Sequence, residues 1–206
     1  MKDVMSGQSN SPKAQESSSF EYPIHELLAS RRSGRSFSAQ PVHAVTLATL
    51  FEAARWAASS FNEQPWNFIF ATKETPEDFA RMLNCLLDFN IQWAKSAAVL
   101  ILSIARLNFA GTEKPNRLAL HDVGQATANL QIQATALGLF AHPMAGFDIE
   151  KTRNEFSIPR DHEPMSVIAV GYPGKPDDLP EKLRVRELTP RKRFLQSSFV
   201  SNRNLL

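Results

Sequence analysis

The stretch from Arg117 to Phe140 carries the longest helical pattern in this 206-residue chain and constrains the fold more than any other. At about 1.5 Å per residue, a helix of this length spans roughly 35 Å. Apolar side chains recur at helical spacing along one face: Leu118, Val123, Ala126, Leu130, Ala134 and Leu137. Others cover much of the remaining surface: Leu120, Ala128, Ile132 and Ala136. Because few sides are left for water, we expect this helix either at the centre of the core or against a second subunit.

Shorter patterns on either side predict a mixture of strands and helices. Apolar residues at helical spacing predict a helix over Val45–Ala57, and a Thr-Pro-Glu-Asp start predicts another from Pro76 to about Leu87. Aromatic, β-branched or aliphatic runs predict three strands: Trp66–Thr72, Val99–Leu102 and Ser166–Val170. A turn is expected over His142–Phe147, with a short helix following from Asp148.

Two segments lack any periodic pattern. Residues Met1–Ser19 are rich in Ser, Gln, Asn and Lys and hold almost no large apolar side chains. A disordered tail is therefore expected at residues 1–19, and one domain over residues 20–206. The segment Pro173–Pro190 is proline-rich and is expected to be an extended arm lying on a surface, that of a partner included.

The composition limits the class of protein. With 43% hydrophobic and 21% charged residues, it is that of an ordinary globular protein. The formal net charge of only +2 makes the basic clusters local features, not a general nucleic-acid signature. The single cysteine, Cys85, cannot form an internal disulfide and is expected to be a packed thiol in a reducing compartment. No apolar run reaches the roughly 20 residues of a membrane span, and no apolar segment resembles a secretory signal, so a cytoplasmic protein is expected.

Arg31–Arg35 places three guanidinium groups, a hydroxyl and a glycine within five residues, just after a short helical pattern over Ile24–Ala29. Guanidinium groups match the oxygens of phosphates and carboxylates, and Gly34 is expected to ease a sharp turn. On its own this cluster is also compatible with a solvated surface. Two further polar clusters, Ser59–Trp66 and Arg191–Arg193, favour an anion-binding site.

The sequence lacks the motifs of several common enzyme classes. It contains no Gly-x-Gly-x-x-Gly turn, no Walker loop and no Gly-x-Ser-x-Gly elbow. Its five histidines are widely spaced without cysteine partners, so no metal site is expected. No acid, base or nucleophile stands out, and we assign no catalytic side chain. This combination is typical of proteins in which a bound cofactor carries the reaction, and a phosphate-bearing flavin fits it.

Five motifs, in the same order, resemble those of the FMN-dependent nitroreductase family. Arg31–Phe37 is similar to its RRS-x-R-x-F opening, and Ala54–Trp66 to its A-x-x-APSS-x-N-x-QPW block. Asn90–Ala94 resembles its N-x-x-W motif, and Pro143–Asp148 resembles its P-(M/I)-x-GFD turn. Arg191–Arg193 resembles its late basic motif. The motifs together span nearly all of the chain after the tail.

The resemblance implies a nitroreductase-like α+β fold. In this fold helices flank a central, mainly antiparallel sheet, a long helix lies in a homodimer interface, and a C-terminal arm is extended. It also implies two FMN sites in that interface, and it assigns these residues to cofactor binding: Arg31, Arg32, Ser33, Arg35, Ser59, Ser60, Asn62, Asn90, Met144, Ala145, Gly146, Arg191 and Arg193. For Arg32, a plain surface charge is the simpler interpretation.

Apart from Arg32, each of these residues receives a role from the resemblance. The phosphate and ribityl chain would be held by Arg31, Ser33, Arg191 and Arg193. Arg35 would face the N1–O2 edge of the flavin ring, and Asn90 would face its other polar edge. The ring face and N5 region would be lined by Met144, Ala145 and Gly146. The partner subunit would contribute Ser59, Ser60 and Asn62, with Phe61 near the substrate. Two positions depart from the family pattern: Ala58 replaces a proline, and Phe194-Leu195 replaces Lys-Pro.

The implied activity is an NAD(P)H oxidoreductase that reduces nitroaromatic, quinone or similar small molecules by a ping-pong mechanism. Its partners would be a small-molecule acceptor and a second copy of the chain, with neither nucleic acid nor membrane. One alternative is a flavin-free module that binds an acidic partner or nucleic acid through the basic C-terminal arm. Another is a flavin enzyme of the same fold with a different reaction, such as reductive dehalogenation or flavin breakdown.

Overall fold

The computed structural model describes residues 16–17 and 19–202. The described residues form a larger unit, residues 25–188, and a smaller unit that combines the described residues before 25 with those after 188. The tail expected at residues 1–19 lies mostly outside the described residues and stays a prediction. Within the smaller unit, strands β1 (Glu16–Ser17) and β6 (Arg193–Phe194) pair antiparallel, and a 3-10 turn follows at Gln196–Ser198.

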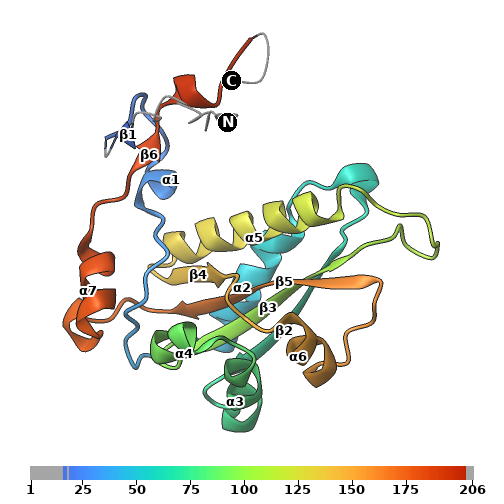
Figure 1. Ribbon diagram of the computed structural model, residues 1–206, viewed down its shortest axis with the longest axis horizontal. Coiled ribbons are helices and arrows are strands. Elements are labelled where there is room, and N and C mark those ends of the chain that lie inside the picture. Colours follow the sequence, from blue (N-terminus) through green and yellow to red (C-terminus); the bar gives the residue numbers. More distant parts are fainter. Residues whose placement is uncertain (1–15, 18, 203–206) are drawn as a thin grey trace, which may run out of the picture. The chain divides into compact units, whose positions relative to one another are not determined.

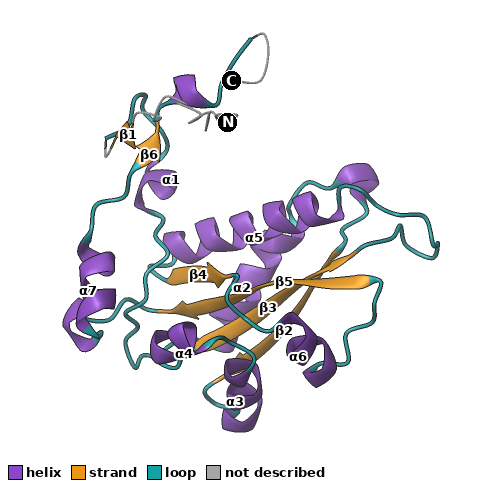
Figure 2. Cartoon of the chain, in the orientation of Figure 1, coloured by secondary structure: helices purple, strands orange, loops and turns teal. Residues whose placement is uncertain are grey.

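The larger unit is built on a four-stranded antiparallel sheet in the order β2-β3-β5-β4 (Figure 2). The strands are β2 (Trp66–Thr72), β3 (Val99–Arg106), β4 (Phe140–Met144) and β5 (His162–Gly171). The two central strands contain the longest buried runs, because both of their faces are covered by other elements. The three predicted strands are therefore confirmed, and two of them are longer than the apolar runs that predicted them.

Helices cover both faces of the sheet (Figure 1). On one face lie α2 (Ala44–Arg55) and α5 (Ala119–Ala136). On the other lie α3 (Pro76–Asn84), α4 (Asp88–Ala94) and α6 (Ile149–Glu155). Two further helices lie near the two ends of this unit's sequence, α1 (Glu26–Ser30) and α7 (Glu181–Leu188). No helix within the described residues is long and apolar enough to cross a membrane.

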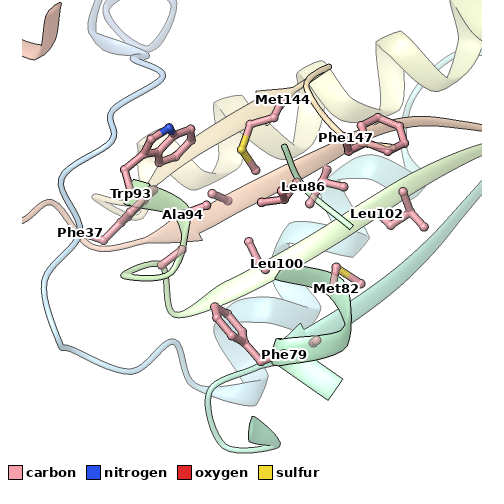
Figure 3. Close-up of a cluster of buried hydrophobic side chains, with 14 of the residues drawn as sticks. Phe37, Phe79, Met82, Leu86, Trp93, Ala94, Leu100, Leu102, Met144 and Phe147 are labelled. Atoms are coloured by element: carbon pink, nitrogen blue, oxygen red, sulfur yellow. The ribbon is translucent and has the colours of Figure 1, made fainter. Parts of the chain in front are cut away.

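Side-chain alternation along β3 divides the core into two clusters. Val99 and Ile101 pack toward α2 and α5, whereas Leu100 and Leu102 pack toward α3 and α4. Figure 3 shows the second cluster, in which Trp93 lies beside Phe37. Trp93 is thus a core aromatic, and Cys85 is buried in the same region.

The chain between α5 and α6 differs from the prediction. The expected helix over Arg117–Phe140 ends at Ala136, because Gly138 takes a positive φ of 72° and the amide of Leu139 turns back to the carbonyl of Ala134. Phe140–Met144 then forms β4 against β5. The turn predicted at His142–Phe147 is therefore wrong for its first half, where tertiary pairing decides the conformation.

Two further helices were not predicted. The helix expected to run from Pro76 to Leu87 ends at Asn84, and Leu87 instead caps α4. The prediction of an extended arm over Pro173–Pro190 is wrong for Glu181–Leu188, which forms α7 after a 3-10 turn at Pro176–Asp178. A short helix rich in charged residues carries little apolar periodicity, so sequence reasoning had no signal for α7.

Candidate functional site

The segment Arg31–Phe37 leaves α1 without regular structure and is held by contacts on both sides. The Ser36 hydroxyl donates to the carbonyl of Lys175 at 2.6 Å, and Phe37 is buried. Gly34 lies against the ring of Phe140, where an added Cβ would fall 2.1 Å from the nearest ring carbon. Glycine is therefore required here for close packing, not for the sharp turn that the sequence suggested.

The arginines of this segment point to different partners. Arg31 donates through Nη1 to the Ser33 hydroxyl at 3.1 Å and approaches Gln131 Oε1 of α5 at 3.5 Å. Arg32 donates through Nη2 to the backbone carbonyl of Glu187 on α7. Arg31 and Ser33 are thus hydrogen-bonded to each other, whereas the guanidinium of Arg32 is hydrogen-bonded to α7.

Arg35 lies where three elements of the larger unit meet. Its guanidinium stands over the ring of Trp93 from α4, 5.8 Å from the ring centroid, and is 4.0 Å from the carboxylate of Glu187. Burial lowers the pKa of Arg35, the nearby Glu187 raises it, and Arg186 lowers it. Trp93 also packs against His142 of β4, with the two rings tilted and 4.6 Å between their centroids. The cation therefore sits in a partly desolvated setting of rings with one carboxylate beside it.

His142 links β4 to the arginine segment. Its Nδ1 lies 3.1 Å from the carbonyl oxygen of Gly34. Burial lowers the pKa of His142 to about 4, and the positive charge of Arg35 adds to this effect. The imidazole is therefore neutral at pH 7, and its Nδ1–H donates to Gly34.

Asn90 and Gly146 form a second close contact, one turn of α4 away from Trp93. Asn90 is 5% exposed and donates through Nδ2 to the carbonyl of Gly146 at 3.0 Å. An added Cβ on Gly146 would lie 2.5 Å from the Phe89 ring and 2.7 Å from Asn90 Nδ2. The backbone after β4 can therefore pass this close to α4 only at a glycine. Ala145 is exposed, whereas the Met144 side chain is buried in the core (Figure 3).

The loop Ser59–Gln64 is held in an unusual conformation. Phe61, Asn62 and Gln64 all have positive φ angles of 49–56°, a region that side chains rarely adopt. Asp122 of α5, 1% exposed, accepts the Ser60 amide at 3.0 Å, and the Ser59 hydroxyl accepts the Gln64 amide at 3.0 Å. These bonds fix a loop whose tip, the Phe61 side chain, is 90% exposed.

The end of β3 and the long loop that follows it, before α5, support the loop Ser59–Gln64. Arg106 donates to the carboxylate of Glu63 at 3.0 Å, and the same carboxylate accepts the amide of Ala110. The Phe109 ring meets the Phe61 ring edge-on, 6.2 Å between centroids. The Phe61 ring is therefore exposed to solvent, but the Phe109 ring holds its orientation.

The structure brings the predicted residues of the larger unit into two groups. Arg31–Arg35 lies with α4 and β4, whose residues Asn90 and Gly146 touch each other, while Ser59, Ser60 and Asn62 share the loop tied to Asp122. Arg191 and Arg193 belong to the smaller unit, where Arg193 donates to the carbonyl of Lys192 at 2.7 Å, and their roles stay predictions. Sequence reasoning missed the buried carboxylates Asp122 and Glu187, because no local pattern marks a charge that only tertiary packing buries.

Comparison with known proteins decides the family. The sequence model described as the nitroreductase family matches residues 28–172, which is more than half of the chain. The chain belongs to the nitroreductase family. As a member of this family it is an oxidoreductase, and its α+β fold with an antiparallel sheet is the fold of the family's solved structures.

Individual nitroreductase relatives cover most of the chain. A Streptomyces coelicolor protein named "Putative NADH dehydrogenase/NAD(P)H nitroreductase" is 30% identical over 169 residues, which cover 73% of this chain and 83% of the relative. A solved structure described as an oxidoreductase containing FMN has a TM-score of 0.86 at 32% identity, covering 97% of this chain and 99% of that chain. A nitroreductase family protein from Clostridium difficile has a TM-score of 0.68 at 26% identity, covering 89% and 100%.

The residues of this nitroreductase fit a phosphate-bearing flavin. Arg31 and Ser33 offer donors to a phosphate, as guanidinium and hydroxyl groups do elsewhere. Arg35 offers a cation in a setting of rings, and Asn90 offers an amide held against the backbone of Gly146. Within the part of the chain that the structure describes, no group of three or more His, Cys, Asp or Glu side chains is arranged to hold a metal ion.

Proposed function

We propose that the chain is an FMN-dependent NAD(P)H oxidoreductase that reduces nitroaromatic, quinone or similar electron-poor small molecules by a ping-pong mechanism. One observation carries the proposal. The arginine segment, α4 and β4 converge at Arg35, Trp93 and His142, next to the Asn90–Gly146 contact. A cationic segment and a buried amide beside a backbone turn are groups that suit a phosphorylated flavin.

Each residue has a role in binding and orientation. Arg31 and Ser33 hold the phosphate and ribityl chain, with Arg191 and Arg193 contributing from the C-terminal segment. Arg35 faces the N1–O2 edge of the ring, and Asn90, held by Gly146, presents its amide to the other polar edge. Ala145 lines the ring together with the backbone of Met144 and Gly146, since the Met144 side chain is buried in the core. When bound, FMN would supply the chemistry of two-electron transfer between NAD(P)H and the acceptor.

The protein residues orient and shield, and none needs to act as an acid or base. Neutral His142 keeps the carbonyl of Gly34 hydrogen-bonded and adds no second positive charge beside Arg35. Phe61, oriented by Phe109, offers an apolar surface that covers a planar acceptor and keeps water away.

The proposal includes a homodimer. Leu120 on α5 and Leu137 just after it remain 45% and 38% exposed, and Trp56, just after α2, is 74% exposed. This apolar surface suits a second copy of the chain better than water. In such a dimer Ser59, Ser60, Asn62 and Phe61 serve the site of the partner. A reduced, buried Cys85 fits a cytoplasmic location.

The test begins with colour. Purified protein is expected to be yellow, with absorption bands near about 375 and about 450 nm from bound flavin. Initial rates with varied NADH or NADPH and varied nitroaromatic or quinone should give parallel double-reciprocal lines, because both substrates use one ring face in turn. Colourless protein that FMN cannot reconstitute would favour a flavin-free binding module instead.

Replacement of Arg35 tests the assignment of a residue. Arg35→Ala is expected to weaken FMN retention and slow reduction by NAD(P)H much more than it affects folding, because it removes the cation beside the ring. Arg160→Ala is the matched control, since Arg160 is exposed and pairs with Glu150 on the surface of α6. Normal FMN content together with unchanged reduction kinetics in Arg35→Ala would contradict the assignment.

A further inference from the structure

Glu187 connects α7 to the arginine segment through three contacts. Its carboxylate Oε2 accepts the backbone amide of Arg35 at 3.0 Å and lies 4.0 Å from the Arg35 guanidinium. Its backbone carbonyl accepts a hydrogen bond from Arg32. One residue near the end of α7 therefore holds the chain on both sides of Gly34.

The burial of Glu187 makes these contacts unusual. The residue is 5% exposed, whereas the other glutamate of α7, Glu181, is exposed and pairs with Arg184. A buried carboxylate is costly unless charged or polar groups compensate it. The compensating groups here belong to Arg35, the residue assigned to the flavin edge. A carboxylate used only to anchor α7 would not need to lie beside that guanidinium.

The negative charge of Glu187 changes the electric field that Arg35 exerts on a bound flavin ring. A cation beside the ring favours the negative charge that reduction adds, and charges act strongly in a partly desolvated site. A carboxylate next to that cation cancels part of its field. It also restricts where the guanidinium can point.

We propose that Glu187 is a positioning residue for Arg35: it orients the guanidinium and offsets part of its positive charge, and so keeps the midpoint potential of the bound flavin lower than Arg35 alone would set it. The inference rests on the proposed function, because it requires FMN beside Arg35. It adds a residue outside the family motifs to the set that controls electron transfer.

Glu187→Gln tests the proposal with little change in shape. Glutamine keeps an oxygen that can accept the Arg35 amide but carries no charge. The midpoint potential of the bound flavin, measured by titration with reference dyes, is expected to shift to a more positive value. FMN affinity should change only a few-fold. The control is Glu181→Gln on the same helix, for which the potential should equal that of the wild type.

A double-variant comparison shows whether Glu187 acts through Arg35. In an Arg35→Ala background, Glu187→Gln should shift the potential less than it does in the wild type, because the guanidinium is gone. If Glu187→Gln fails to fold, the midpoint potential of the bound flavin is measured in Glu187→Asp instead. It keeps the charge but moves it away from Arg35, so a smaller positive shift is expected.

Three results would overturn the proposal. The first is a flavin potential in the charge-removing variant equal to that of the wild type, even with a lowered melting temperature, since this would leave Glu187 a purely structural role. The second is an equal shift with and without Arg35. Failure of the wild-type protein to bind FMN would overturn the proposed function as well, and is measured first, so the two failures are distinguishable.

Discussion

Gly34→Ala provides a sharp test of how the arginine segment is held in place. The added Cβ would lie 2.1, 2.3 and 2.8 Å from three carbons of the Phe140 ring, all of them well inside van der Waals contact. One of the three is Cγ, at which the ring is attached, so rotation of the ring about the Cβ–Cγ bond cannot remove the clash. Either the ring or the segment Arg31–Arg35 must move.

The expected cost follows from overpacking. Forcing a methyl group into a filled site costs typically 1–3 kcal/mol, and we expect about 2 kcal/mol here. For a chain of this size such a loss lowers the melting temperature by roughly 4–8 °C. Because the displaced segment carries Arg31 and Arg35, FMN affinity should fall as well.

Phe140→Ala supplies the control, because it removes all three clashing carbons. We expect Gly34→Ala to cost less than about 0.5 kcal/mol in the Phe140→Ala background, which gives a strong coupling between the two sites. Urea unfolding followed by circular dichroism measures all four proteins of this cycle. An unchanged melting temperature for Gly34→Ala, or an equal cost in both backgrounds, would refute the packing argument.

Two further predictions concern His142 and Asp122. Because the pKa of His142 is lowered from 6.5 to about 4 in the folded chain, the unfolded chain binds the proton first as the pH falls. Stability should therefore drop between pH 6.5 and pH 4, by on the order of 3 kcal/mol for the full shift. His142→Gln should flatten this pH dependence of the unfolding free energy, and an unchanged slope would contradict it. Asp122→Ala should cost about 2 kcal/mol and speed amide exchange at Ser60, since it removes a charged acceptor from a loop with positive φ angles, whereas Asp122→Asn should cost less. Equal exchange rates at Ser60 in both variants and the wild type would count against this role.

Much of the fold could be predicted because its signals are local. The apolar run at Val99–Leu102 predicted a strand that proves to be central in the sheet, and helical spacing predicted α2 and α5 within a few residues. The errors lie where tertiary contacts override local preference. Phe140–Met144 is followed by residues typical of a turn, yet it pairs with β5 as a strand. The helix α7 has little apolar periodicity of its own.

In the candidate site, too, the sequence predicted some residues and only the structure revealed the others. The motifs marked Arg31–Arg35, Asn90 and Gly146, because residues with donor groups or tight backbone approaches occur in recognisable short patterns. The partners that hold these residues came only from the structure. Gly34 meets Phe140, Asn90 meets Gly146, and Ser60 meets Asp122 across 62 positions of sequence.

The amino-acid sequence by itself determined the family, the strand and helix types of the strongest patterns, and the cationic residues offered to a ligand, since these depend on residue chemistry and spacing along the chain. Only the tertiary structure decided which charges are buried and what faces them. Burial and proximity arise when distant segments pack together. This is why Glu187 gave no local signal yet lies against Arg35.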